Sequence, residues 1–466
     1  PSTPHRRVDT TERPALQWVE ARCLSFGGSV AYLLWLDGLR GLLRVKADDP
    51  PLEVHDVLRQ RVDDVCPDHG DDVFPHLARL MSLPLDEDVE ATLRGLGGQG
   101  LKAGTFRAVE TLIESAARRR GPLVLVCEDL HWADPTSLEL LEQLLPLADR
   151  APVLFICLFR AETQHGCWRI KEIASRILPQ RHTDLSLQPL SAAESEQLVD
   201  SLLCVDNRPA GLGRRILEHA EGNPFYVEEI IHSLIADGAF AQSDNGSCVQ
   251  PVRAAGPLAI PDTLGGVLMA RIDRLEAETK RILQLAAVVG RAFYYRILEV
   301  IAKKGHELEC DLSTLQREDM IRERARIPEL EYIFKHQLTQ AAAYESLLKK
   351  ERRSFHRQVA EALEELFSDR VEEHLELLAH HWERADDREQ AIEYLSRAGQ
   401  KAAGSYANAE ALAHFERALE LSEGSDQYDN ILTNRAKVRL EMFQGQDSAQ
   451  DYQELLERAR QVANPQ

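Results

Sequence analysis

Two short apolar segments that alternate with helical segments constrain the fold most. Leu123 to Cys127 contains no polar residue, and Pro152 to Phe159 is equally apolar. A strand without polar alternation is typical of burial on both faces, as in the middle of a parallel sheet. Asp134-Pro135 between them predicts a helix N-cap followed by proline at the first helical position. This alternation favours an α/β fold with a parallel sheet, whose ligands lie beyond the carboxyl ends of the strands.

The segments before this pair continue the same pattern. Leu16 to Cys23 reads as a strand, Gly27-Gly28 as a break and Tyr32 to Leu43 as a helix. A longer helix is expected over Leu101 to Arg119, ended by Gly121-Pro122 just before the apolar strand. The N-terminal part therefore predicts several strand–helix units of one sheet.

The strand at 123–127 is followed by two acids, Glu128 and Asp129. This layout suits the Mg²⁺ of a bound nucleotide, because a rigid strand can present one carboxylate to the water shell of the metal and the other to an attacking water. Two acids after an apolar strand are more often the entry to an ordinary turn. The pattern alone therefore leaves both interpretations open.

The longer string from Glu128 to Leu138, EDLHWADPTSL, resembles the Walker B segment of P-loop ATPases of the STAND class. Such ATPases accompany bacterial adenylate and guanylate cyclase domains and occur in MalT-like and LuxR-type regulators. The resemblance implies an AAA/STAND NTPase core over 1–185, with Glu128 at the metal and Asp129 as a catalytic residue. It also implies that Arg160, in Leu158 to Glu162, senses the γ-phosphate, although a solvated arginine after a strand explains that residue equally well.

The resemblance continues at Glu221 to Glu229, EGNPFYVEE, within a helical lid expected over 186–245. It implies that Gly222 and Pro224 form a turn that packs near the adenine and couples the lid to the nucleotide. The same letters also predict a glycine C-cap, an asparagine N-cap and proline at the first helical position. The two interpretations are compatible.

A winged-helix-like module is expected over 258–365, after a Gly-, Ser-, Asn- and Pro-rich linker at 244–261. The segments that resemble this module are Ile260 to Leu264, Ala270 to Leu275, Val289 to Phe293, Phe334 to Leu338 and Tyr344 to Leu348. The resemblance makes His336 a candidate contact of the β-phosphate. A lone histidine is more often a structural residue, so that alternative stays open.

The last hundred residues, 366–466, are expected to form TPR-like helical repeats. Small and large apolar residues recur there at an offset of twenty positions rather than thirty-four. The two sets are Ala391, Leu395 and Ala398, and then Ala411, Phe415 and Ala418. We expect this region to bind a protein partner or a small-molecule effector.

The phosphate-binding loop of the family, a Gly-rich turn with Lys and then Ser or Thr, does not occur in the sequence. Gly95 to Lys102 has neither its spacing nor its hydroxyl. We expect the loop upstream of Pro1, in a longer protein that binds ATP or ADP with Mg²⁺. We expect that parent to be a slow regulatory ATPase, which in this family can be fused to an adenylate cyclase or another output domain. The chain as given is expected to bind ATP poorly or not at all.

The formal charge of −21 disfavours contact with nucleic acid or anionic lipid. Eight scattered cysteines without a CxxC pair and the absence of a long apolar run favour a reducing cytoplasm and no membrane. The acidic stretch from Asp63 to Asp72 lacks calcium-loop spacing and is expected to be a solvated loop. His374, His380 and His381 do not form a zinc motif and are expected to line packed helices.

Two functions of different class fit these observations. The first is a signal-transduction ATPase whose nucleotide switch moves the lid and the winged helix, with nucleotide-dependent homo-oligomers. The second is a nucleotide-incompetent scaffold in which the TPR-like repeats bind protein. Direct DNA binding by the winged helix is disfavoured by the acidity of the chain.

Overall fold

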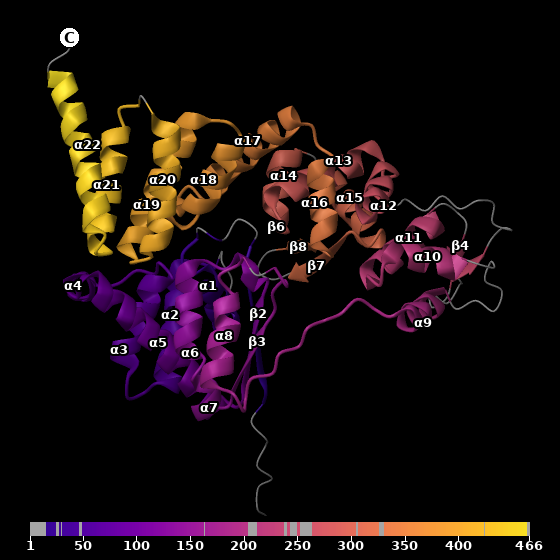
Figure 1. Cartoon of the computed structure of the whole chain (residues 1–466), viewed down its shortest axis with the longest axis horizontal. Helices are drawn as coiled ribbons and strands as arrows, with labels where there is room; N and C mark the ends of the chain where they lie inside the picture. Colours follow the sequence, from indigo (N-terminus) through magenta and orange to yellow (C-terminus); the bar gives the residue numbers. More distant parts are fainter. Residues whose placement is uncertain are drawn as a thin grey trace, which may run out of the picture. The chain divides into compact units, whose positions relative to one another are not determined.

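A computed structural model of the chain describes residues 15–24, 28, 30–45, 49–162, 164–203, 212–236, 240–242, 249–251, 263–303, 306–325, 330–423 and 425–463. The chain divides into two compact units. The first combines residues 1–184 with 369–466, which are the indigo to purple and the yellow parts of Figure 1. The second consists of residues 185–368. The predicted linker at 244–261 lies outside the described residues, except for 249–251.

The sheet of the first unit consists of β1 (Gln17–Arg22), β2 (Leu123–Glu128) and β3 (Val153–Cys157). All pairs are parallel and the spatial order is β1-β2-β3. The central strand β2 is buried from Leu123 to Cys127, and only its last residue, Glu128, is partly exposed. The sequence prediction of a parallel sheet with a doubly buried central strand is therefore confirmed.

Helices lie beside this sheet (Figure 1). They are α1 (Leu33–Leu43), α2 (Pro51–Val65), α3 (Gly70–Leu80), α4 (Glu87–Gly95), α5 (Gly97–Arg120), α6 (Pro135–Leu144), α7 (Leu147–Arg150) and α8 (Trp168–Ile177). The N-cap predicted at Asp134 is present, because its side chain accepts a hydrogen bond from the backbone N–H of Ser137.

The prediction of a solvated loop from Asp63 to Asp72 was wrong. Asp63 lies in the last turn of α2, and Asp72 lies in the first turn of α3. The apolar face of α2, which includes Val54, Leu58 and Val62, is buried and holds the helix in place. Acids in the first turn of α3 also favour a helix, because they face the positive end of its dipole.

The C-terminal segment of the first unit is helical. Its helices are α18 (Leu375–Arg384), α19 (Arg388–Gly404), α20 (Asn408–Ser422), α21 (Tyr428–Glu441) and α22 (Gly445–Ala463). The six small and large apolar residues that recur in the sequence are all buried, in α19 and α20. Their offset of twenty residues is therefore the distance between two consecutive helices that pack together.

The second unit begins with α9 (Ala192–Leu203), α10 (Leu212–Ala220) and α11 (Pro224–Ala236), followed by the strands β4 (Phe240–Gln242) and β5 (Val249–Pro251). The remaining helices are α12 (Leu264–Asp273), α13 (Ala277–Val289), α14 (Tyr295–Ala302), α15 (His306–Arg317), α16 (Gln337–Glu345) and α17 (Lys349–Leu366). A second small sheet consists of β6 (Ala292–Tyr294), β7 (Ile321–Ala325) and β8 (Glu331–Phe334), antiparallel in the order β6-β8-β7.

One apolar core connects the first helices of the second unit. Val199 of α9, Ile216 of α10 and Ile230 of α11 share a buried cluster with Val267 of α12. A buried ion pair between Glu229 and Arg271 also joins α11 to α12. Ser191 and Glu194 form a capping box at the start of α9. Within the described residues, no helix is long and apolar enough to cross a membrane.

The contact between α19 and α20 depends on Gly399. A Cβ atom built at Gly399 would lie 2.6 Å from a ring carbon of the buried Phe415. We predict that Gly399→Ala lowers the free energy of unfolding by about 1–3 kcal/mol, because overpacking forces the neighbouring side chains to move. Urea unfolding followed by circular dichroism measures this change.

Gly404 is the matched control, because it ends the same helix and a Cβ atom there would meet no atom within 4 Å. Gly404→Ala should leave the stability unchanged or raise it by less than about 1 kcal/mol. Equal losses in the two variants would contradict the packing described for Gly399.

Candidate functional site

The carboxyl edge of the parallel sheet gathers the polar residues that the sequence singles out. Arg22 at the end of β1 is in register with Glu128 at the end of β2, and Cys127 is in register with Cys157 of β3. Glu128 and Asp129 therefore leave the sheet from its central strand, and Arg160 follows the neighbouring strand. Parallel strands place their carboxyl ends at one edge, which is where α/β folds hold ligands.

Glu128 forms an ion pair with Arg22, and this contact was not predicted from the sequence. The backbone N–H of Arg22 also donates to Asp37 of α1, at 2.9 Å. Both side chains of the pair are partly exposed, Arg22 by 12% and Glu128 by 26%. A metal at Glu128 would therefore have to compete with the Arg22 guanidinium for the carboxylate.

Asp129 has a left-handed backbone conformation, with φ 54° and ψ 37°. This conformation is uncommon for residues other than glycine, although Asp and Asn tolerate it better than most. It ends β2 and begins a short 3₁₀ turn, Leu130–Trp132. The chain thus turns sharply directly after the acid strand.

His131 within that turn is buried, with 8% of its surface exposed, and neither ring nitrogen has a hydrogen-bond partner. Its ring contacts the rings of Trp132 and His165. Burial, followed by the charge of Arg160, lowers the pKa of His131, so the imidazole is neutral at pH 7. A neutral, unsatisfied histidine beside the two acids is a polar group that sequence reasoning missed.

Arg160 lies against the same turn. The central carbon of its guanidinium is 5.8 Å from the centre of the Trp132 ring, a cation–π geometry. The structure therefore brings Glu128, Asp129 and Arg160 to one edge of the sheet. Whether they bind a nucleotide stays a prediction. The described residues contain no group of three His, Cys, Asp or Glu side chains arranged to hold a metal ion.

The other predicted site residues belong to the second unit. Gly222 has φ +78°, and a Cβ atom there would lie 2.5 Å from the carbonyl oxygen of Leu190. Asn223 accepts a hydrogen bond from the backbone N–H of Phe225 at 3.0 Å, and Pro224 begins α11. The capping interpretation of this turn therefore describes its structure, and a role at the adenine remains a prediction.

His336 lies directly against that turn. Its ring lies over that of Phe225, with ring centres 3.8 Å apart and the ring planes inclined by 35°, and its Nε2 atom is buried without a hydrogen-bond partner among the described residues. Burial is the main cause that lowers the pKa of His336, and nearby Lys335 adds to the effect. Sequence reasoning assigned the turn and the histidine to separate modules, and the structure brings them together within one unit.

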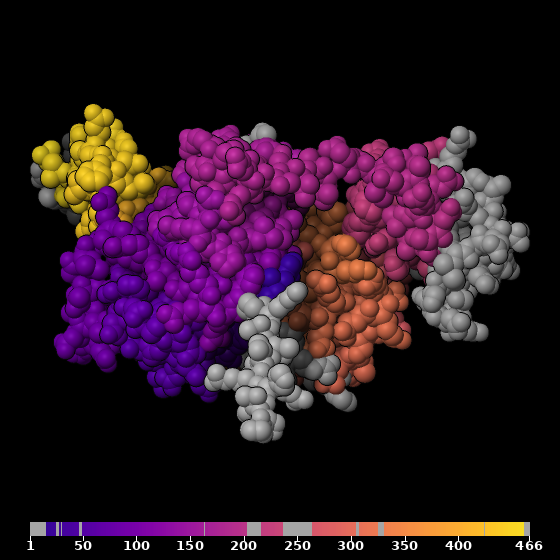
Figure 2. All heavy atoms as spheres, turned by 90° about the horizontal axis from the view of Figure 1, so that it is seen from below, coloured from indigo at the N-terminus to yellow at the C-terminus, as the bar shows by residue number. Residues whose placement is uncertain are grey.

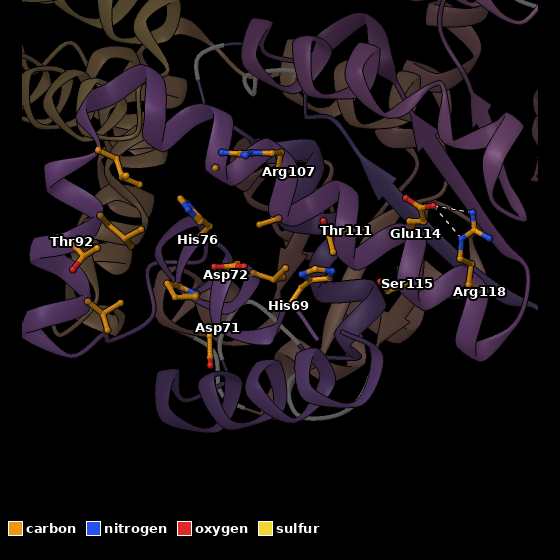
Figure 3. Close-up of a pocket in the computed structure, with 17 residues that line it drawn as sticks. His69, Asp71, Asp72, His76, Thr92, Arg107, Thr111, Glu114, Ser115 and Arg118 are labelled. Atoms are coloured by element: carbon orange, nitrogen blue, oxygen red, sulfur yellow. Dashed lines mark hydrogen bonds and ion pairs between the residues drawn. The ribbon is translucent and has the colours of Figure 1, made fainter. Parts of the chain in front are cut away.

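A cavity of about 940 Å³ lies between α3, α4 and α5. Figure 3 shows its polar side chains, which include His69, His76, Arg107 and Thr111. Gly104 leaves space for the His76 ring, since a Cβ atom there would lie 2.1 Å from it. None of the predicted site residues is among the described residues that line this cavity.

Comparison with known proteins supports the coarse assignment of the N-terminal part. Residues 5–156 match the family model described as "AAA ATPase domain". Residues 191–247 match a second model, described as "Domain of unknown function (DUF8739)". The first match covers β1, β2 and most of β3. The ATPase-like class predicted for this part of the chain is thus confirmed at the level of the domain.

The chain is also similar to "Uncharacterized protein R02095" of Rhizobium meliloti (strain 1021), with 26% identity over 357 residues. The similarity covers 75% of this chain and 32% of that protein, so the chain spans about a third of the length of this relative.

Among solved structures, a STAND protein with a tetratricopeptide repeat sensor from Pyrococcus horikoshii shares 10% identity. The alignment covers 97% of this chain and 76% of that chain at a TM-score of 0.33, a similarity too low to support an argument.

The stack of His336 on Phe225 can be tested by titration. We predict that Phe225→Ala raises the pKa of His336 towards its ordinary value, because removal of the ring lets water reach the imidazole. An NMR titration of the histidine ring protons measures the shift.

Phe443→Ala is the control, because the Phe443 side chain is 84% exposed and lies in the first unit. It should leave the titration of His336 unchanged. An unchanged pKa of His336 in Phe225→Ala would show that the stack does not shield the imidazole.

Proposed function

We propose that the chain is part of a signal-transduction ATPase of the STAND class, in which a nucleotide switch is coupled to a helical sensor. The observation that carries this proposal is the pair Glu128-Asp129 at the carboxyl edge of a parallel sheet whose segment matches an AAA ATPase domain. Arg160 after the neighbouring strand supports it, because a cation there can compensate negative charge on a phosphate.

The residues at this edge fit half of a nucleotide site. Bound Mg²⁺-ATP would supply the phosphoryl group and the charge neutralisation that its transfer needs. Mg²⁺ keeps several waters and takes one or two carboxylates from the protein, so Glu128 suffices on the protein side once Arg22 releases it. Asp129 would orient the attacking water. His131 lies buried in the turn after these acids, and its ring nitrogens have no hydrogen-bond partner among the described residues.

The other half of the nucleotide site is the phosphate-binding loop, and the free edge of β3 is the location that we propose for it. Among the described strands β3 pairs only with β2, yet Leu154 is 55% exposed and Leu158 is 46% exposed. Strands of parallel sheets are normally covered on both faces, and an edge strand leaves unpaired backbone N–H and C=O groups with which a further strand can pair. We propose that a strand carrying the phosphate-binding loop pairs with this edge, and that it belongs to the parent protein.

We propose that 258–365 acts as a winged-helix module and 366–466 as a TPR-like sensor. The antiparallel sheet β6-β8-β7 with its helices supports the first assignment, and the packed consecutive helices α18 to α22 support the second. Exposed apolar side chains on the last two helices and their turn, Leu440, Phe443, Tyr452 and Leu456, support a protein partner there.

The scaffold alternative is favoured by one observation, the ion pair that occupies Glu128. The two proposals separate in an ATP-binding measurement on the product of the complete gene, with residues 1–466 alone as the comparison. The switch proposal predicts micromolar to millimolar binding, on the order of ordinary enzyme substrates, by the complete product and little by 1–466. Binding by neither protein would favour the scaffold.

We further predict the effects of two substitutions in a product that binds ATP. Glu128→Gln and Asp129→Asn should retain ATP binding and slow hydrolysis by about a hundredfold or more, because each removes a charge that positions the metal or the water. Phosphate release measured under single-turnover conditions gives the rate.

The control is Glu162→Gln, whose carboxylate is 64% exposed and pairs with His165 rather than with the sheet edge. It should leave the rate within about threefold of the unmodified protein, a difference of under 1 kcal/mol. Unchanged turnover in both Glu128→Gln and Asp129→Asn would refute the roles proposed for these acids.

A further inference from the structure

The turn between α19 and α20 docks on the N-terminal part of the first unit. The backbone carbonyl of Ser405 accepts a hydrogen bond from the Tyr32 hydroxyl at 3.4 Å. The Tyr406 ring occupies the space above Gly98, where a Cβ atom would lie 1.2 Å from it. Figure 2 shows the yellow C-terminal helices beside the indigo and purple N-terminal part. The docked turn thus joins two segments that are distant in sequence.

Glu410, in the first turn of α20, makes the most buried polar contact of this docking surface. It is 1% exposed, and its two carboxylate oxygens accept from the backbone N–H and the hydroxyl of Thr136, each at 2.9 Å. Thr136 is the second residue of α6, so its N–H has no partner within the helix. A residue from the repeats therefore caps the helix that follows the acid strand.

Asp134 caps the same helix from within the core. It has no exposed surface, and one oxygen, Oδ1, accepts from the backbone N–H groups of Ser137 at 2.8 Å and Tyr32 at 3.0 Å. Its other oxygen, Oδ2, is buried and has no hydrogen-bond partner among the described residues. Two buried carboxyl groups from different segments therefore share the N-terminus of α6.

Titratable groups from several segments surround this pair. Asp134 interacts electrostatically with Glu410 of α20, the Tyr32 hydroxyl before α1 and the Cys23 thiol after β1. His414, one turn after Glu410 on α20, is also buried. Burial, followed by the charge of Glu410, raises the pKa of Asp134 to about 7, so most of Asp134 is protonated below neutral pH.

We propose that Asp134 and Glu410 form a latch that couples docking of the C-terminal helices to the start of α6, six residues after the acid strand. In the docked state Glu410 supplies the second cap of α6, and in the released state Thr136 loses that cap. The latch therefore gives the sensor a direct mechanical connection to the segment that carries Glu128 and Asp129.

The latch depends on pH in a defined direction. Release of α20 would remove the charge of Glu410, the second cause that raises the pKa of Asp134, while Asp134 would stay buried in the core. The pKa of Asp134 is therefore higher in the docked state, at about 7, than in the released state. Between these two pKa values the docked state binds more protons, so docking should weaken as the pH rises towards about 7 and change little above it.

Hydrogen exchange of residues 1–466, without nucleotide, tests the latch. This readout needs no nucleotide site, so it succeeds or fails independently of the proposed ATPase function. The reporter is the peptide that contains Thr136 and the first turn of α6. Its exchange rate is corrected for the intrinsic pH dependence of amide exchange. Glu410→Ala should speed its exchange by about tenfold or more, the size expected for a lost buried hydrogen bond to a charged group.

Two further variants make the test specific. Asp134→Asn keeps the oxygen that caps Ser137 and places an N–H donor where Oδ2 has no partner among the described residues. The Thr136 peptide of this variant should therefore stay protected from exchange, and its protection should no longer decrease as the pH rises. Glu420→Gln is the control on α20, because Glu420 is 64% exposed and pairs with Arg417. It should exchange like the unmodified chain.

The latch proposal is wrong if the Thr136 peptide exchanges no faster in Glu410→Ala than in Glu420→Gln. It is equally wrong if Asp134→Asn shows the same decline of protection with pH as the unmodified chain. Should Glu410→Ala fail to fold, the pH series of Asp134→Asn alone decides between these outcomes.

Discussion

The pairing of β2 with parallel neighbours on both sides is the constraint on which the rest of the first unit depends. It buries Leu123 to Cys127 from end to end and fixes where the strand stops. The two acids must then emerge at the carboxyl edge, and the left-handed conformation of Asp129 turns the chain directly into the segment that leads to α6. Burial of one strand thus sets the position of the candidate site.

Only a short stretch of chain separates that site from the docked repeats. Glu128 and Asp129 end the strand, Asp134 begins α6, and Thr136 receives Glu410 from the C-terminal helices. A movement of α20 therefore has a direct route to the acids through one helix cap. The electrostatic cost of two buried carboxyl groups makes this route sensitive to its surroundings, which a purely apolar contact would not be.

The parts of the structure that depend on periodicity could be predicted from the sequence. The strand at 123–127, the N-cap at Asp134 and the buried stripe at Ala411, Phe415 and Ala418 all follow from local pattern. The acidic stretch from Asp63 to Asp72 was misjudged, because the charges on the exposed faces of α2 and α3 concealed their apolar faces.

Contacts between distant segments could not be predicted in this way, because no local sequence pattern indicates them. The pairs Arg22–Glu128, Phe225–His336 and Thr136–Glu410 join residues far apart in sequence, and no sequence pattern indicates that the two members of a pair meet. For Glu410 the only indication was its place beside the buried Ala411. Sequence reasoning therefore located the acid strand and missed the groups that surround it.

The most direct measurement of the central claim concerns the free edge of β3. Hydrogen exchange of the β3 amides that do not bond to β2 can be compared between residues 1–466 and the product of the complete gene. If a strand with the phosphate-binding loop pairs with this edge, these amides should be protected by about a hundredfold or more in the complete product, as expected for a strand inside a stable sheet. Equal exchange in both proteins would contradict the account and leave β3 as an edge strand of the sheet.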